Sequence, residues 1–342
     1  MTAEPTLCAI VPPYVLDRLA EDGHEPAARS LALDAAHRAA RLTATLPAFP
    51  ARAADRLERV ISDAAHRERL PGRTVRREGE SPLPDQSANR AYDGLGDTWT
   101  LFSAVFGRHS IDDQGLRLDA TVHYGRNYDN AFWDGQRMVF GDGDGEVFGD
   151  FTACVDVIGH ELTHGVTQFT AGLEYRDQPG ALNESVSDVF GSLVKQYALG
   201  QDAAAADWLI GAGLLAPGVQ GVALRSMKAP GTAYDDPRLG KDPQPAHLRD
   251  YVRTSQDNGG VHINSGIPNH AFYLLATALG GPAWERAGRI WYDALTGRRL
   301  PGDADFTAFA RATVAAAKAR YPEPEVADTV TASWAKVGIS PT

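Results

Sequence analysis

The sequence is poor in the features that define several common classes of protein. Its 342 residues include only two cysteines, Cys8 and Cys154, which excludes a disulfide framework and a CxxC metal site. It has no run of about 18 apolar residues, so no membrane-spanning helix is expected. Lys and Arg together number 33 against 44 Asp and Glu, and the net charge of −11 argues against binding to nucleic acid phosphates. Any metal must therefore be held by histidines and carboxylates.

The start of the chain also lacks the basic stretch and the apolar run of roughly 7 to 15 residues that form a secretory signal. We therefore expect a protein that is cytoplasmic as synthesised, and export by a leaderless route stays open. No apolar heptad pattern is visible, so we expect a monomer.

Residues 1–50 are predicted to form a separable first segment. Proline at positions 47 and 50 interrupts the chain after an Ala-rich stretch, which places a boundary between about 45 and 60. The Ala-rich stretch carries apolar residues at helical spacing, namely Leu31, Leu33, Ala36 and Ala40.

The rest of the chain changes its periodicity near residue 151. Residues 51–151 are rich in Gly, Asp and aromatics, with alternating runs at 116–124 and 138–140, and predict a β-rich subdomain with one helix over 97–106. Residues 152–342 are mainly helical by pattern, and the fold class is therefore α+β. The helices predicted in this second half cover 152–170, 183–199, 268–279, 283–295 and 305–319.

A candidate metal site lies in the apolar helix predicted over 152–170. His160 and His164 are one turn apart on the same face, so both imidazoles can reach one ion, and Glu161 can reach a metal-bound water. HExxH by itself is moderately specific, and two histidines without a metal remain an alternative.

A second predicted helix supplies the residues that complete this site. Glu184 follows His164 by 20 residues and can be a third ligand, which leaves one position for water, as a catalytic zinc requires. Asp188, one turn later, can accept the hydrogen bond of a zinc-bound histidine. Both could instead be ordinary charges on a helix face. Farther on, His262 lies in a Gly-rich turn, from which it could donate to a developing oxyanion.

Taken together, these motifs resemble the thermolysin-like zinc metallopeptidases over residues 70–340. The resemblance implies a two-domain fold with the zinc site in the cleft between the β-rich and the helical half. The first segment, with CAIVPPY at 8–14, resembles the short pro-segment of the protealysin-like subgroup. The matching motifs are NAFW at 130–133, GDGDG at 141–145, HELTH at 160–164, Tyr175, NESVSD at 183–188, LRSM at 224–227 and DNGGVHINSG at 257–266.

The resemblance implies an endopeptidase that hydrolyses protein or peptide substrates without an acyl-enzyme and is made as a self-processing precursor. It assigns zinc to His160, His164 and Glu184, and the role of general base to Glu161. It gives oxyanion stabilisation to Tyr175 and His262, with His262 oriented by Asp257. Substrate backbone would be held by Asn130, the Ala131 carbonyl and Arg225.

The resemblance also implies an apolar pocket that favours Leu, Ile or Phe on the amine side of the scissile bond. The candidate lining residues could equally be plain core residues. They are Phe148, Val157, Ile210 and Leu224.

Calcium is the main departure from the family pattern. Asp156 and Asp207 are present, but Lys195, Leu209 and Ala212 stand where the family has carboxylates. Calcium needs six to eight oxygen ligands, so the paired calcium site is expected to be lost or weakened. The GDGDG segment lacks the twelve-residue loop of a calcium site and is interpreted as a structural turn.

Cys8 is a candidate for latency, because its thiolate could occupy the open zinc position if the first segment covers the cleft. A free thiol without such a role is the alternative, and Cys154 is interpreted as a small core residue. Two other functions stay open: an HExxH aminopeptidase, for which no amine-recognition motif is visible, and a catalytically silent zinc-binding protein. Glu161, Tyr175 and His262 are all present, which argues against the silent protein.

Overall fold

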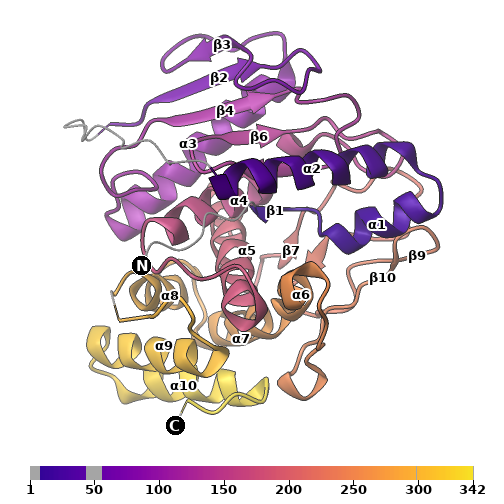
Figure 1. Ribbon diagram of the computed structural model, residues 1–342. Coiled ribbons are helices and arrows are strands. Elements are labelled where there is room, and N and C mark those ends of the chain that lie inside the picture. The colour runs from indigo at the N-terminus through magenta and orange to yellow at the C-terminus, as the bar shows by residue number, and fades with distance from the viewer. Residues whose placement is uncertain (1–7, 44–55, 298, 342) are drawn as a thin grey trace.

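The computed structural model describes residues 8–43, 56–297 and 299–341. A sheet forms one layer of the molecule and a set of helices forms the other, with two long helices between them (Figure 1). The predicted α+β class is confirmed. The predicted boundary between 45 and 60 lies largely outside the described residues.

The main sheet has six strands in the order β1-β5-β6-β4-β2-β3. The strands β2, β4 and β6 are neighbours and run parallel, whereas the remaining pairs are antiparallel. The predicted runs at 116–124 and 138–140 contain β4 and β6. In chain order the strands are β1 (Cys8–Ala9), β2 (Arg59–Asp63), β3 (Arg73–Arg77), β4 (Leu118–Val122), β5 (Ala131–Trp133) and β6 (Met138–Phe140).

Helix α3 (Gln86–Phe106) is about twice as long as the helix predicted over 97–106. It begins where the Asp85 side chain accepts hydrogen bonds from the backbone of Ser87 and Ala88. The first half of the helix was not predicted because it contains Gly94, and glycine is a poor helix former. In the fold it allows close packing, since a Cβ there would lie 2.4 Å from Cδ1 of Ile158.

The helical layer contains the five helices predicted for the second half, with shifted ends, and two further helices, α6 and α10. Two short strand pairs and two 3-10 turns lie in the connections. The strand pairs are β7 (Leu209–Ile210) with β8 (Arg225–Ser226) and β9 (Asp235–Asp236) with β10 (Gly240–Lys241), and the turns are η1 (Phe151–Ala153) and η2 (Leu248–Asp250). The helices are α4 (Val155–Gln168), α5 (Asp177–Leu199), α6 (Asp257–Asn264), α7 (Gly266–Leu279), α8 (Ala287–Thr296), α9 (Phe306–Arg320) and α10 (Pro324–Lys336).

Two glycines bring α4 and α5 into close contact. A Cβ on Gly191 would lie 2.4 Å from the carbonyl oxygen of Asp156, and one on Gly159 would lie 3.1 Å from Cα of Gly191. A larger residue at either position would push the helices apart. The spacing between the side chains that face each other across α4 and α5 therefore depends on these two positions.

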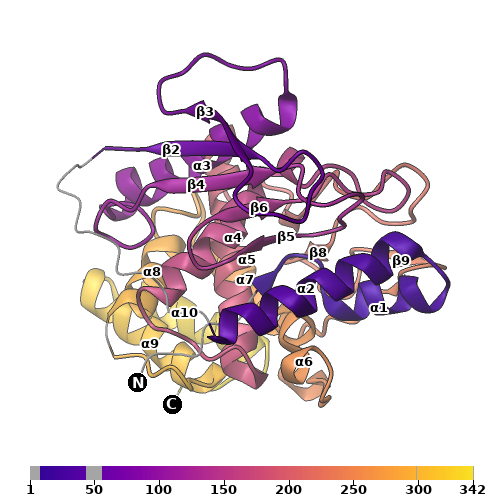
Figure 2. The ribbon, with the colours of Figure 1, turned by 45° about the horizontal axis from the view of Figure 1, so that its top comes forward.

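The first segment forms β1, α1 (Pro13–Glu21) and α2 (Glu25–Thr43), which lie along the side where the two layers meet (Figures 1 and 2). Pro13 begins α1, where the missing N–H of proline is tolerated. The apolar pattern marks the buried face of α2 only in part, since Leu31 and Leu33 pack against the core but Ala36 and Ala40 are exposed. Ser30 and Asp34 are buried instead.

The core is formed by one large apolar cluster that includes side chains from both layers and from the first segment. At its helical end, Trp291 and Trp334 stack with ring centroids 5.5 Å apart and an interplanar angle of 4°. Among the described helices, none combines the length and the apolar character needed to cross a bilayer.

Candidate active site

Three side chains from α4 and α5 point at one another in the interior. His160 Nε2 lies 3.0 Å from His164 Nε2, and each of these nitrogens lies 3.5 Å from a carboxylate oxygen of Glu184. All three residues are buried. Glu184 Oε2 has no hydrogen-bond partner among the described residues, although it is buried. Two imidazoles and a carboxylate that converge in this way suit a zinc ion with one open position.

The other nitrogen of each histidine is held by a polar partner. His160 Nδ1 donates to Asp188 Oδ1 at 2.8 Å, as predicted. His164 Nδ1 donates to Asn183 Oδ1 at 2.9 Å and lies 3.1 Å from Ser187 Oγ, two partners that the sequence analysis did not identify. Such contacts fix the ring orientation and leave the Nε2 atoms free to bind a metal.

Asp188 is in turn held by two further residues. Arg225 donates to both of its carboxylate oxygens at 2.8 Å, and Asn269 Nδ2 donates to Oδ2 at 2.8 Å. Burial alone would raise the pKa of Asp188, but Arg225 and His160 lower it to about 2. The carboxylate is therefore ionised, and it connects the zinc-facing histidine to Arg225.

Glu161 lies beside these ligands and has one free oxygen. Its Oε2 accepts a hydrogen bond from the backbone N–H of Trp133 at 3.0 Å, whereas its buried Oε1 has no hydrogen-bond partner among the described residues. Burial raises the pKa of Glu161 to about 8. A carboxylate in this environment can accept a proton from a nearby water.

Tyr175 and His262 approach the same point from two other elements. The Tyr175 hydroxyl donates to Glu184 and lies 3.3 Å from His262 Nε2. His262 is held by Asp257, which lies 2.6 Å from Nδ1 and also accepts from the His262 backbone N–H at 2.8 Å. Burial lowers the pKa of His262, but Glu184 and Asp257 outweigh this effect and raise it.

Residues 8–11 of the first segment lie along β5, and Cys8 and Ala9 form an added strand there. β1 pairs antiparallel with β5, the backbone N–H of Ile10 donates to the Ala131 carbonyl at 3.1 Å, and that of Val11 donates to Asn130 Oδ1 at 2.9 Å. Arg225 Nη1 donates to the Ile10 carbonyl at 3.1 Å. The three predicted substrate-binding residues therefore contact the protein's own backbone.

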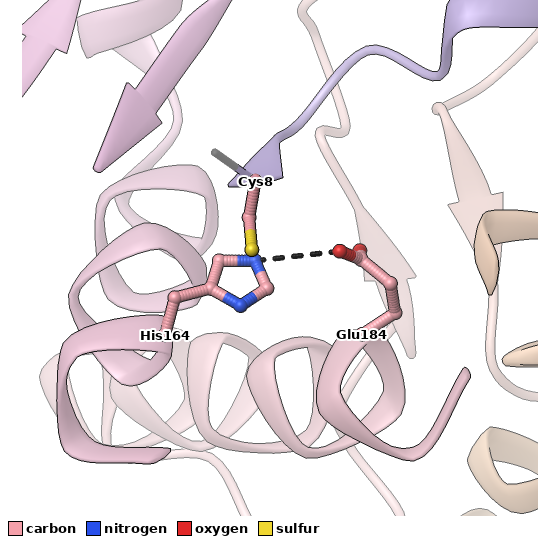
Figure 3. A group of neighbouring side chains, drawn as sticks. All are labelled: Cys8, His164 and Glu184. Atoms are coloured by element: carbon pink, nitrogen blue, oxygen red, sulfur yellow. Dashed lines mark ion pairs between the residues drawn. The ribbon is translucent and has the colours of Figure 1, made fainter. Parts of the chain in front are cut away.

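Cys8 reaches from β1 toward the zinc-facing residues (Figure 3). Its sulfur lies within 4.8 Å of ligand atoms of both His164 and Glu184. The next residue, Ala9, presents its carbonyl oxygen to His262 Nε2 at 3.1 Å. A carbonyl only accepts, so Nε2 carries the proton in this contact.

Comparison with known proteins places this arrangement in a family. Two family models match the chain: "Thermolysin metallopeptidase, catalytic domain" over residues 61–168 and "Thermolysin metallopeptidase, alpha-helical domain" over residues 171–339. The chain is 52% identical over 339 residues to "Extracellular metalloprotease" of Pectobacterium carotovorum subsp. carotovorum, a match that covers 97% of this chain and 96% of that protein. The chain belongs to the thermolysin family of metallopeptidases.

The structure of this thermolysin-family metallopeptidase is also similar to a solved precursor. "Precursor of Protealysin, Metalloproteinase from Serratia proteamaculans" superposes with a TM-score of 0.90 and 53% sequence identity, over 97% of this chain and 100% of that one. The expected two-domain, thermolysin-like fold of the protealysin type is thus confirmed.

The expectation of a cytoplasmic protein is wrong. The Pectobacterium relative is named as extracellular, and so is "Extracellular minor metalloprotease" of Serratia marcescens (strain ATCC 21074 / E-15), which is 48% identical over 226 residues, 66% of this chain and 64% of that protein. These names point to secretion. The expectation depended on the start of the chain alone, which does not determine where a folded enzyme is delivered.

The apolar residues predicted to form a pocket are all buried in the main core cluster, which also contains Ile10. Leu224 directly precedes Arg225, whose guanidinium binds the Ile10 carbonyl. Leu224 is therefore adjacent in sequence to a residue that contacts the segment in the cleft. The four predicted pocket positions are Phe148, Val157, Ile210 and Leu224.

Lys195 lies between two carboxylates of this thermolysin-family chain. Its Nζ lies 3.0 Å from Asp156 Oδ2, 3.0 Å from Asp207 Oδ1 and 3.0 Å from the carbonyl oxygen of Leu209. Asp156 is buried, and burial raises its pKa although Lys195 acts in the opposite direction. Ala212, the last of the three substituted positions, contributes only its carbonyl, which accepts from the Cys154 thiol at 3.5 Å.

The GDGDG segment forms a turn held by its own side chains, as interpreted from the sequence. Asp144 Oδ1 accepts backbone hydrogen bonds from Glu146, Val147 and Phe148 at 2.8 to 3.1 Å. Asp144 also pairs with His24 of the first segment at 2.7 Å. These contacts of Asp144 hold the turn in place.

Proposed function

We propose that the chain is a zinc endopeptidase made as a latent precursor, which cleaves before large apolar residues. The observation that carries this proposal is the position of residues 8–11, whose backbone contacts each group expected to hold a substrate. The Ala9 carbonyl faces His262, and the Ile10 N–H faces the Ala131 carbonyl. The peptide bond between Ala9 and Ile10 therefore stands where a scissile bond would lie.

The donor set fits zinc, because two imidazoles and one carboxylate converge around a buried oxygen that lacks a hydrogen bond among the described residues. His160, His164 and Glu184 would hold the ion. When bound, zinc polarises the substrate carbonyl and lowers the pKa of water toward about 7.

The side chains around the cleft carry out the remaining steps of the reaction. Glu161 Oε1 takes the proton of the attacking water and delivers it to the leaving amine. Tyr175 and His262 donate hydrogen bonds to the oxyanion that develops on the substrate carbonyl, and Asp257 holds His262 in place. Asn130, Ala131 and Arg225 fix the substrate backbone in an extended conformation against β5.

Specificity for a large apolar residue follows from the same alignment. Ile10 supplies the residue on the amine side of the aligned bond and is fully buried. A substrate with Leu, Ile or Phe at this position would bury its side chain in the same apolar surroundings. Phe148, Val157, Ile210 and Leu224 are proposed to form the pocket.

Latency follows because a substrate cannot enter while the strand is in place. We propose that Cys8 binds the zinc ion through its thiolate and excludes the water that would attack the Ala9–Ile10 bond. Removal of the first segment, within the predicted boundary of 45 to 60, would release the cleft.

Two finer proposals concern calcium and assembly. The ammonium group of Lys195 supplies the positive charge between Asp156 and Asp207, so we propose that the paired calcium site is absent. Leu199 and Val222 are the large apolar side chains found exposed among the described residues, and such isolated positions support a monomer.

The decisive experiment uses the purified chain and an internally quenched peptide with Leu after the intended scissile bond and both ends blocked. We expect cleavage before Leu that a zinc chelator abolishes, together with loss of about 45 to 60 amino-terminal residues, identified by mass spectrometry. Glu161→Gln is the matched control, since it keeps the size of the side chain but removes the base.

The alternatives give different results in the same assay. An aminopeptidase would leave the blocked peptide intact and cleave one with a free amine. A silent zinc-binding protein would cleave neither peptide after full processing. For latency, Cys8→Ser should shorten the lag before activity appears, and an unchanged lag would remove Cys8 from the proposal.

A further inference from the structure

A second group of two histidines and one aspartate lies outside the cleft. His66, His123 and Asp142 each offer a ligand atom, and these atoms lie within 4.8 Å of one another. We refer to these three residues as the sheet-end cluster. The proposed function uses none of them.

The topology of the sheet explains why these residues meet. β2, β4 and β6 are adjacent and parallel, so their carboxyl ends lie at the same edge. His66 follows β2, His123 follows β4 and Asp142 follows β6, each within three residues of the strand end. This edge of parallel strands is where ligands commonly bind.

Backbone hydrogen bonds continue past the strands and fix the three segments relative to one another. The His66 N–H donates to the His123 carbonyl at 2.9 Å, and the Tyr124 N–H donates to the Phe140 carbonyl at 3.1 Å. The positions of the cluster residues are therefore determined by the sheet and not by loose loops.

The imidazole-to-carboxylate distances within the cluster are slightly shorter than those among the candidate zinc ligands. His123 Nδ1 lies 2.8 Å and 3.0 Å from the two oxygens of Asp142, and His66 Nδ1 lies 3.3 Å from Asp142 Oδ2. In the cleft, His160 Nε2 and His164 Nε2 each lie 3.5 Å from an oxygen of Glu184. Small side-chain movements would open the cluster around one ion.

A fourth residue orients one of the imidazoles. His123 Nε2 lies 3.0 Å from Asp85 Oδ2, and Asp85 is itself fixed because it caps α3. A metal-bound histidine commonly donates its other N–H to a carboxylate in this way. Asp85 accepts a hydrogen bond from His123, just as Asp188 accepts one from His160.

From this geometry we propose that the sheet-end cluster binds one divalent transition-metal ion, of which zinc is the expected occupant. Imidazole nitrogens favour zinc, copper and nickel over calcium and magnesium. His66 is the accessible ligand, with 55% of its side chain exposed, so the ion can enter from solvent. The bound ion would tie together the segments that follow three strands of the sheet.

Protons compete with the metal at this site. Asp142 and Asp85 raise the pKa of His123 to about 9, so at neutral pH a proton must leave His123 when the ion binds. The alternative interpretation is a purely ionic cluster in which a protonated His123 bridges two carboxylates.

The test uses the full-length Glu161→Gln chain, which cannot cleave itself, loaded with one equivalent of zinc. Zinc is then titrated at pH 7.5 and followed by calorimetry and by native mass spectrometry, neither of which reads activity. We expect a second equivalent to bind. His66→Ala and Asp142→Asn should weaken this second event at least tenfold, and Asp85→Asn roughly 10- to 100-fold.

His109→Ala is the matched control, because it removes another exposed histidine outside the cluster. It should leave the second event unchanged. A parent chain that takes up no second zinc overturns the proposal, and so does a second event that is equal in the parent and in His66→Ala. Because His66 is exposed, its replacement should not impair folding even if Asp142→Asn does.

Discussion

The helical layer and helix α2 of the first segment are held by different kinds of contact. In the helical layer, Trp291 stacks on Trp334, and Phe309 packs against both rings edge-on. The first segment adds apolar side chains to the core, but its helix α2 also docks through buried polar groups. Ser30 Oγ accepts from the Asp129 N–H at 2.9 Å, and Asp34 accepts from Tyr128 and Asn130.

We expect the apolar contact to be permanent and the polar contact to be reversible. Apolar burial gives a stabilisation that depends little on pH, whereas buried polar contacts depend on the protonation of their partners. A segment that is to leave the cleft after synthesis benefits from the second kind. The following predictions test this comparison, beginning with the largest expected effect.

Trp334→Ala should remove a large part of the permanent contact. Trp334 is fully buried, and its Nε1 donates to Thr313 Oγ1 at 2.9 Å. We expect the free energy of unfolding to fall by about 3 to 5 kcal/mol, measured by denaturant titration of the Glu161→Gln chain. A loss below about 1 kcal/mol would contradict the assignment of this layer as the stable part.

Lys195→Met tests whether a polar contact can also be permanent when it is buried and paired. The substitution leaves Asp156 buried without its cation, and we expect a loss of about 3 kcal/mol in the free energy of unfolding. Lys195→Glu should instead make the melting temperature depend on added calcium, because it restores an oxygen ligand. Arg249→Met, which removes an exposed ion pair with Asp250, is the control and should change little.

Two results would contradict this account of Lys195. One is a parent chain whose melting temperature already rises with calcium. The other is a Lys195→Met chain as stable as the Arg249→Met control.

Asp34→Asn tests whether docking of the first segment depends on pH. Burial raises the pKa of Asp34 from 3.8 to about 6, although Tyr128, Arg38 and Asn130 act against this. The docked carboxyl holds its proton more tightly than the released one. Its contribution to docking is therefore full below about pH 4 and is lost as pH rises through about 6.

His37 acts in the opposite direction, because burial lowers its pKa and its protonation at low pH disfavours docking. Asp34→Asn keeps His37, so the difference in pH dependence between the parent and the variant reports the titration of the Asp34 carboxyl alone. The test is amide hydrogen exchange over residues 8–43, which measures the equilibrium constant for opening of this segment. As the pH rises from 4.5 to 7.5, this constant should increase on the order of tenfold more in the parent than in Asp34→Asn. Ser30→Ala should weaken docking at every pH without changing its pH dependence, and equal pH profiles for parent and Asp34→Asn would refute the idea.

Much of the site was predictable because HExxH and the later Glu184 have a spacing that chemistry requires. The partners of the ligands were harder to find. Asn183, Ser187 and Asn269 are polar residues on helices, and nothing in the sequence distinguishes a buried partner from an exposed one. Their roles became visible only when α4 and α5 were placed side by side.

The fold was predicted well where the pattern was periodic and less well elsewhere. Glycines masked the first half of α3, because their value lies in close packing against α4 and not in helix propensity. Part of the buried face of α2 was missed for the opposite reason. Leu31 and Leu33 pack against the core, but Ser30 and Asp34 are buried beside them, and a hydrophobic pattern does not mark polar positions.

The strand formed by residues 8–11 has a consequence for the order of events during synthesis. It is synthesised before its partners Asn130, Arg225 and His262, which lie 119 to 253 positions later in the chain. The cleft cannot form before these residues are made and folded. The strand that closes it is by then already tethered to the same chain at a high effective concentration. Under the proposed latency, the cleft is therefore occupied from the moment it forms.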